Sequence, residues 1–113
     1  QYTTKRLLTL MQSYIVKWKF HCVEKQVAAY QKFVEYADAG YPEDKFDGFE
    51  IKFRYHAPGD GTGVIVCKAD GADAIFKHFA PWRAQFGMEL DITPAMSCAQ
   101  VVESHRQLFN ESA

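Results

Sequence analysis

Four short stretches of the chain are predicted to be strands, because apolar and polar residues alternate along three of them and the fourth is a short apolar run bounded by turn residues. The four stretches are Gln12 to Phe20, Phe49 to His56, Val64 to Ala69 and Met88 to Thr93. Strict alternation in the second stretch assigns its residues to two faces. The inner face would hold Phe49, Ile51, Phe53 and Tyr55, and the outer face would hold Glu50, Lys52, Arg54 and His56.

Helices are predicted between these strands, because apolar residues recur there every three or four positions. The first helix would end at Gly40 and carry Val23, Val27, Tyr30, Val34 and Ala37 on its apolar face. The second would begin at Asp70 or Asp73 and carry Ile75, Phe76, Phe79, Trp82 and Phe86. Pro81 lies within this second pattern, so the helix either kinks there or ends near His78 and restarts at Pro81.

A C-terminal helix is predicted after Ser97, because Gln100 follows three residues later with the spacing of a capping box. The element order is therefore β-α-β-β-α-β plus a C-terminal helix, which is the order of the ferredoxin-like α+β fold. In that fold an antiparallel sheet carries two helices on one face, and its first and fourth strands are neighbours. Lys17 and Lys19 would then lie beside Glu89 and Asp91, where opposite charges pair across strands.

Domain organisation follows from the absence of repeats, low-complexity segments and linkers. Residues 11–113 are predicted to form a single ferredoxin-like domain, and residues 1–10 an N-terminal extension. The 113-residue length is sufficient for a hydrophobic core without disulfides or a structural metal.

Charge and cysteine content exclude several classes of function. The 13 Lys and Arg residues nearly balance the 14 Asp and Glu residues and form no basic cluster, so neither nucleic acid nor an anionic membrane is a predicted partner. The three cysteines are widely separated and are interpreted as reduced thiols of a cytoplasmic protein. No metal site and no cofactor are predicted.

His78 is the strongest catalytic candidate. On a continuous helix it shares a face with Trp82, one turn later, while Arg83 is turned aside. A histidine with an ordinary pKa near 6.5 suits a general base. A ligand cleft beneath His78 would be lined by Tyr14, Trp18, Phe53, Tyr55, Trp82 and Arg83. The alternative is that these aromatic residues fill the core and that His78 is a boundary residue.

His56 offers a second, weaker candidate site. It could bind an anion together with Arg54 and Lys52. The alternative is an ordinary residue at the end of a strand, because the glycines that follow are not succeeded by the helix that a phosphate-binding loop requires.

Residues 11–96 resemble small bacterial proteins of the dimeric α+β barrel superfamily, including an uncharacterised family of this length. The resemblance rests on Tyr14 to Trp18, the hairpin Gly59 to Gly63 and the stretch Phe76 to Gly87. It implies a homodimer with sheets packed face to face and a ligand cleft between sheet and helices. Superfamily members include cofactor-free monooxygenases, isomerases and proteins without known activity.

The sequence is therefore consistent with two functions. The first is binding of a small apolar or aromatic molecule between the sheet and the second helix, with cofactor-independent monooxygenase-like or isomerase-like chemistry. The second is a non-catalytic homodimeric association or regulatory module with a filled core. The expected outer sheet face is more polar than a dimer interface prefers, because it would carry Lys17, Lys19, Lys52, Arg54, Glu89 and Asp91.

Overall fold

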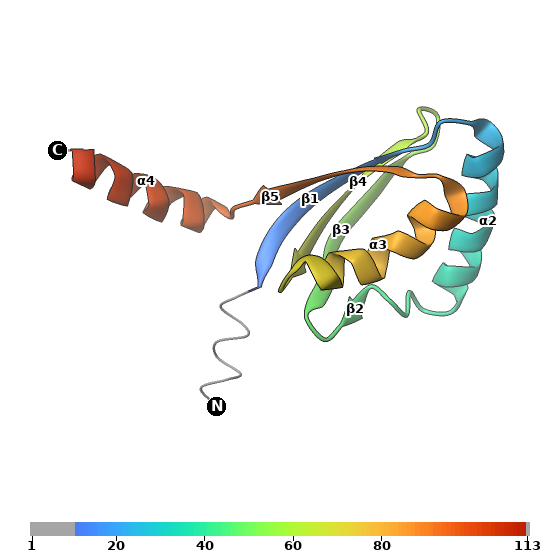
Figure 1. Cartoon of the computed structure of the whole chain (residues 1–113), viewed down its shortest axis with the longest axis horizontal. Helices are drawn as coiled ribbons and strands as arrows, with labels where there is room; N and C mark the ends of the chain where they lie inside the picture. Colours follow the sequence, from blue (N-terminus) through green and yellow to red (C-terminus); the bar gives the residue numbers. More distant parts are fainter. Residues whose placement is uncertain (1–10, 113) are drawn as a thin grey trace.

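The computed structural model describes residues 11–112 and confirms the predicted α+β fold (Figure 1). Its elements are β1 (Gln12–Lys19), α2 (Val23–Asp38), β2 (Lys45–Phe46), β3 (Phe49–Ala57), β4 (Thr62–Ala69), α3 (Ala72–Phe86), β5 (Glu89–Ala95) and α4 (Cys98–Ser112). The short strand β2 was not predicted and lies in the acidic segment that follows α2. The predicted extension, residues 1–10, lies outside the described residues.

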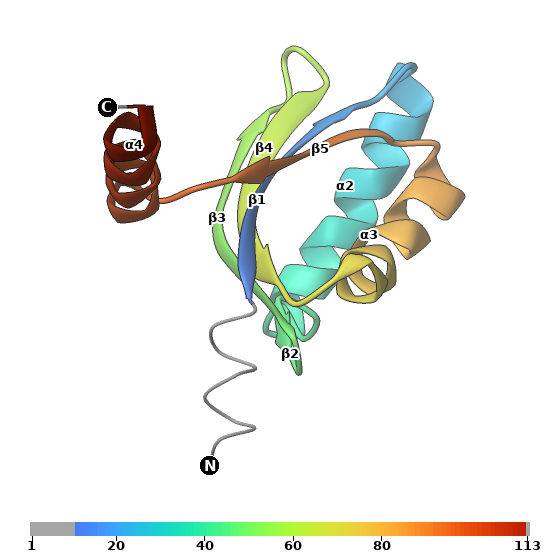
Figure 2. The same ribbon diagram turned by 60° about the vertical axis from the view of Figure 1, so that its left-hand side comes forward.

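The sheet is antiparallel and has the strand order β2-β3-β4-β1-β5. Figure 2 shows α2 and α3 together on one side of the sheet, which we call the inner face, and α4 on the other side. The predicted neighbours β1 and β5 pair, with Lys17 opposite Asp91 and Lys19 opposite Glu89. The opposite charges predicted to lie side by side therefore face each other across these two strands.

A β-bulge interrupts strand β3. Ile51 pairs with Cys67 and Phe53 with Val66, so Lys52 is an extra residue between two consecutive pairs. Because successive side chains of a strand point to opposite faces, one inserted residue exchanges the faces of everything that follows it.

The bulge reverses the predicted orientation of four side chains. Arg54 and His56 share the inner face with the helices, whereas Phe53 and Tyr55 lie on the outer face and are 58% and 68% exposed. The placement of Phe53 and Tyr55 in an inner cleft was therefore wrong. Strict alternation cannot detect an inserted residue, which is the physical reason for the error.

Helix α2 packs through a face that is rotated from the predicted one, and only Tyr30 and Ala37 of the predicted set are half-buried. Val23, Val27 and Val34 are exposed. The packed face carries buried Ala29 and the half-buried residues Tyr30, Phe33 and Tyr36. Both sets of residues have helical spacing, but aromatic side chains bury more area than valines, and the helix rotates to cover them.

Helix α3 is continuous through Pro81 and does not restart there. Its N-cap is Gly71 rather than a neighbouring aspartate, and it ends at Gly87, whose left-handed φ of 63° suits a glycine C-cap. The side chains buried beneath it are Ala74, Ile75, His78, Phe79 and Phe86. Phe76, predicted to be buried, is 72% exposed.

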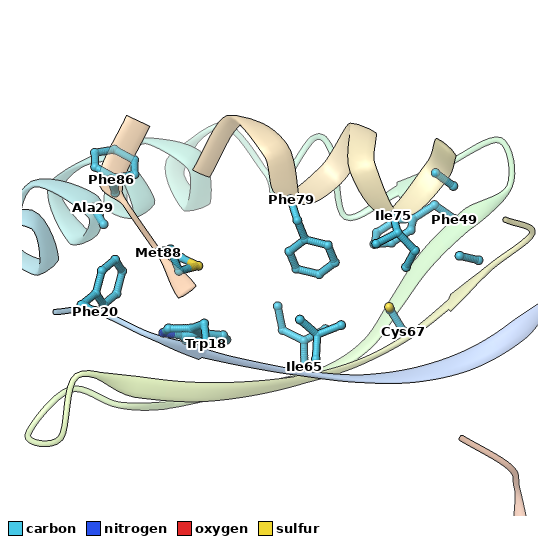
Figure 3. Packing of buried hydrophobic residues seen from close by; sticks show 13 residues of the cluster. Trp18, Phe20, Ala29, Phe49, Ile65, Cys67, Ile75, Phe79, Phe86 and Met88 are labelled. Atoms are coloured by element: carbon cyan, nitrogen blue, oxygen red, sulfur yellow. The ribbon is translucent and has the colours of Figure 1, made fainter. Parts of the chain in front are cut away.

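The core fills the space between the inner face of the sheet and α3. In Figure 3, Ile75 and Phe79 of α3 lie above Trp18, Ile65 and Cys67 of the sheet. The indole ring of Trp18 occupies the space that a side chain at position 63 would need. A Cβ atom on Gly63 would lie 1.9 Å from Trp18 Cζ2, so the ring can pack there only because residue 63 is glycine.

The predicted capping box at the start of α4 is confirmed. The Ser97 amide donates to Gln100 Oε1 at 2.8 Å, and the Gln100 amide donates to Ser97 Oγ at 3.1 Å. These two bonds satisfy amides at the first turn and fix where the helix begins.

Candidate functional site

A pocket with a free volume of about 50 Å³ lies between the inner face of the sheet and helices α2 and α3. Its walls are largely aromatic. The residues on which its chemistry depends are Trp18, Tyr30, Tyr36, Arg54, His56 and His78.

The structure brings together only part of the predicted site. Trp18, His78 and Trp82 line this pocket. Tyr14 and Arg83 line a separate groove between α3 and β5. Phe53 and Tyr55 are excluded from the pocket by the bulge, which turns them to the outer face.

Four polar lining residues were missed as members of this site. Arg54 and His56 replace the two displaced aromatic residues, and no feature of the strand pattern signals the exchange. Tyr30 and Tyr36 come from the packed face of α2. Their spacing to Phe33, three residues in each direction, is a helical signal that could have identified them.

His78 is a buried, neutral histidine with one ring nitrogen available. It is 5% exposed, and its Nδ1 lies 2.9 Å from the carbonyl oxygen of Glu43. A carbonyl oxygen only accepts, so Nδ1 carries the proton and Nε2 has a lone pair. Burial lowers the pKa of His78, although the bond to Glu43 opposes this. Within the described chain Nε2 has no hydrogen-bond partner, so His78 can accept a proton.

The lowered pKa of His78 predicts that acid weakens the fold. The unfolded chain, with histidine pKa values near 6.5, binds more protons than the folded chain once the pH falls to that range. This contribution to stability is therefore complete above about pH 6.5 and is lost as the pH falls through the folded pKa. We expect the unfolding free energy, measured in urea, to decrease between pH 7.5 and pH 5.

Two variants separate the contribution of His78 to the pH dependence of stability from that of the other titrating groups. His78→Gln should reduce the pH dependence, because glutamine does not titrate, while His56, whose pKa is also lowered by burial, retains part of it. Asn110→Gln changes an exposed amide on the polar side of α4 and removes no titrating group, so it should retain the parental slope. An identical slope in the parent and His78→Gln would contradict the assignment.

The side chains of Trp18, Tyr30 and His56 lie close together beneath α2. Trp18 Nε1 is buried and has no hydrogen-bond partner among the described residues. The Tyr30 hydroxyl lies 3.0 Å from His56 Nδ1, and the centroids of the Trp18 and His56 rings are 5.3 Å apart. The indole N–H thus makes no hydrogen bond of normal geometry among the described residues, although it lies close enough to the Tyr30 hydroxyl to influence the pKa of that phenol. A buried donor of this kind is uncommon in native proteins.

Both members of the tyrosine–histidine pair are neutral near pH 7. Burial raises the pKa of Tyr30, and the nearby Trp18 N–H only partly opposes this. Burial also lowers the pKa of His56, and the positive charge of Arg54 lowers it further. The pair can therefore donate or accept a hydrogen bond without adding net charge to the pocket.

Arg54 brings a positive charge that Asp44 compensates. Arg54 Nη2 lies 2.5 Å from Asp44 Oδ1, and the Tyr36 hydroxyl donates to the same oxygen at 2.6 Å. The guanidinium carbon lies 5.2 Å from the centroid of Phe33. Burial and the Asp44 carboxylate raise the pKa of Tyr36, which keeps its phenol protonated. The lining is consequently close to electrically neutral.

Metal and thiol chemistry have little support in the described part of the chain. No group of three His, Cys, Asp or Glu side chains there is arranged to hold a metal ion. Cys67 is buried, which raises the pKa of its thiol to about 11 and makes it a poor nucleophile at neutral pH.

Within residues 11–112, no helix is long and apolar enough to cross a membrane.

Comparisons with known proteins give one family and one related structure. No curated protein matches the chain. A Deinococcus radiodurans protein of solved structure, described as a candidate antibiotic biosynthesis monooxygenase, is 17% identical, with a TM-score of 0.47 over 75% of this chain and 91% of that one. The family described as a domain of unknown function (DUF3303) matches residues 12–109. Because this match spans most of the sequence, the chain belongs to the DUF3303 family.

Proposed function

We propose that the chain binds a small, neutral aromatic molecule in the pocket between the sheet and helices α2 and α3, with an oxygen atom of the ligand on Trp18 Nε1. The unpaired indole N–H carries this proposal. A buried donor without a partner costs about 1–3 kcal/mol. A carbonyl or hydroxyl oxygen in the pocket would recover that cost, while the surrounding rings would bind an aromatic framework.

The charge balance of the pocket favours a neutral ligand over an anion. Arg54 is already paired with Asp44, so a carboxylate on the ligand would have to displace a bond within the protein. Tyr30 and His56 are neutral and offer hydrogen bonds only.

The size of the pocket limits the ligand. A water molecule needs roughly 10–15 Å³ of such space, so about 50 Å³ admits only a few atoms before the protein moves. A full ring therefore requires the side chains that line the pocket to move apart. Two of them, Tyr36 and His78, are held by hydrogen bonds to Asp44 and Glu43.

His78 is the proposed catalytic base. Its Nε2 would take the proton from a hydroxyl or an acidic C–H group of the ligand, and the electron pair would remain on the ligand as an oxyanion or enolate. The Trp18 indole N–H would stabilise the negative charge that develops on the ligand oxygen. Removal of this proton begins both isomerase-like and cofactor-independent monooxygenase-like chemistry.

A second candidate function is a homodimeric association module. The small pocket volume favours it, as does an apolar patch on the outer face of the sheet. The patch spans three adjacent strands and comprises Ile15, Phe53, Tyr55, Val64 and Val66. We propose a homodimer through this patch. The bulge moves Arg54 inside and two aromatic residues outside, which removes much of the polarity that the sequence predicted for this face.

The remaining charges on the outer face are compatible with an interface rim. Lys17 faces Asp91, and Lys19 faces Glu89, within one chain. A cytoplasmic location remains a prediction from the cysteines.

A thermal-shift screen of neutral phenols, quinones and aromatic acids tests the binding proposal. At a concentration of about 100 Kd, a ligand adds roughly 2.7 kcal/mol of stability, which raises Tm by roughly 10 °C in a domain of this size. We expect hits among the neutral compounds, weakened in Trp18→Phe, which keeps a ring but removes the N–H group. Asn110→Gln, on the polar side of helix α4, is the matched control and should bind as the parent does. No shift with any compound would favour the association module.

A further inference from the structure

Helix α4 carries an apolar stripe that the described chain leaves exposed. The stripe has positions three and four residues apart and comprises Cys98, Val101, Val102, His105 and Phe109. Phe109, the largest side chain of the stripe, is 64% exposed. The opposite side of the helix is polar and includes Glu103, Gln107 and Asn110. An amphipathic helix of this kind gains stability mainly by packing its apolar side on another surface.

The direction of α4 separates it from the helices of its own domain. In Figure 2 it lies beyond the outer face of the sheet, whereas α2 and α3 cover the inner face. Only Met96 and Ser97 separate β5 from α4, and Ser97 is already engaged as the cap of the helix. Little free chain remains to return α4 to its own inner face.

A groove of suitable character lies between α3 and β5. It has a volume of about 690 Å³ and is lined mainly by apolar residues. Ala72, Ala80 and Ala84 are small enough to let a second helix approach closely, and exposed Phe76 provides a large apolar contact. The groove also borders β5, an edge strand, which proteins commonly cover.

We propose that α4 of one copy docks in the groove between α3 and β5 of a second copy. This inference rests on the homodimer proposed above, in which the second copy covers the outer face of the sheet, the side on which α4 lies. Face-to-face sheets lie about 10 Å apart. A 15-residue helix is about 22 Å long, so α4 can pass the edge of the partner sheet and reach the side on which the partner's α3 lies.

Paramagnetic broadening of amide resonances between copies tests this docking of α4. One chain carries a spin label at Gln107→Cys, on the polar side of α4, in a Cys22→Ser, Cys98→Ser background; buried Cys67 remains unlabelled. It is mixed with isotope-labelled parent chain, so that only contacts between copies are observed. We expect broadening at Phe76, Ala84 and Ile92, and none with a diamagnetic label.

The two proposals fail in different ways. A dimer in sedimentation with broadening confined to the outer face would overturn the docking of α4 and leave the homodimer standing. A monomer without intermolecular broadening would overturn both.

A pair of variants tests the same contact by affinity. Phe109→Gln removes an apolar side chain from the stripe, whereas Asn110→Gln changes the polar side of the same helical turn. We expect the dimer dissociation constant to rise roughly tenfold or more in Phe109→Gln, as loss of a buried aromatic side chain predicts. Asn110→Gln should leave it unchanged. Equal constants for both variants would overturn the proposal.

Discussion

Replacement of Gly63 by alanine is expected to destabilise the protein by about 2–3 kcal/mol, near the upper end for an added methyl group in a packed core. The new Cβ atom would lie 1.9 Å from Trp18 Cζ2, and two further atoms of the same ring lie within 2.4 Å. Trp18 is buried between the sheet and the helices, so the ring cannot move away without displacing its neighbours.

Urea denaturation of Gly63→Ala and Gly59→Ala measures this effect. A Cβ atom on Gly59 would have no other atom within 4 Å, so this control should unfold close to the parental midpoint. Equal midpoints for the two variants would mean that the indole ring does not lie against residue 63. The Trp18 N–H would then be in a different place, and the proposed ligand contact would fail with it.

Removal of the Asp44 carboxylate is expected to be nearly as damaging. The side chains of Arg54 and Asp44 are 12% and 24% exposed, so Asp44→Ala leaves a largely buried cation without its counter-charge. Breaking a fully buried pair costs about 3–5 kcal/mol. Partial exposure and the contact with the Phe33 ring reduce this, and we expect about 2–3 kcal/mol.

A double variant distinguishes the charge effect from loss of packing. In Asp44→Ala/Arg54→Met the unpaired cation is gone, and the double variant should be more stable than Asp44→Ala alone. Glu35→Ala, which removes an exposed pair with Lys32, should change the urea midpoint little. If the effects of Asp44→Ala and Arg54→Met simply add, the Arg54–Asp44 pair is not coupled as described.

The fold could be predicted from the sequence because several independent patterns agree on it. Alternation placed β1 and β5, and helical spacing placed α2 and α3. The opposite charges at positions 17 and 91 agree with the pairing of the first and last strands that the element order predicts. The capping box fixed the start of α4. Each of these signals is local or depends on a simple pairing of charges, and sequence expresses both directly.

The candidate site could be predicted only in part, because it depends on one inserted residue. Lys52 exchanges the faces of the second half of β3, which brings Arg54 and His56 into the pocket and removes Phe53 and Tyr55. A bulge has no distinct signature in a strand that alternates perfectly. His78, Trp18 and Trp82 line the pocket, because they precede or lie outside the segment affected by the bulge.

The rotation of α2 has a similar explanation. Two sets of residues on this helix have helical spacing, and sequence alone does not decide which of them faces the sheet. In the structure the aromatic set faces the sheet. Phe33 packs there against Arg54 and His56, the residues that the bulge turns inward. The bulge in β3 therefore changes which residues line the pocket, and it supplies two of the residues against which α2 packs.

The most direct test of the proposed ligand site follows the indole N–H resonance of Trp18 while a neutral phenol or quinone identified by the thermal-shift screen is added. The account predicts a saturable downfield shift of that resonance, because the unpaired donor gains an oxygen acceptor. It also predicts an affinity about tenfold lower in Trp18→Phe, as expected for loss of one buried hydrogen bond. Binding that leaves the Trp18 resonance unmoved and is equally tight in Trp18→Phe would contradict the proposed site.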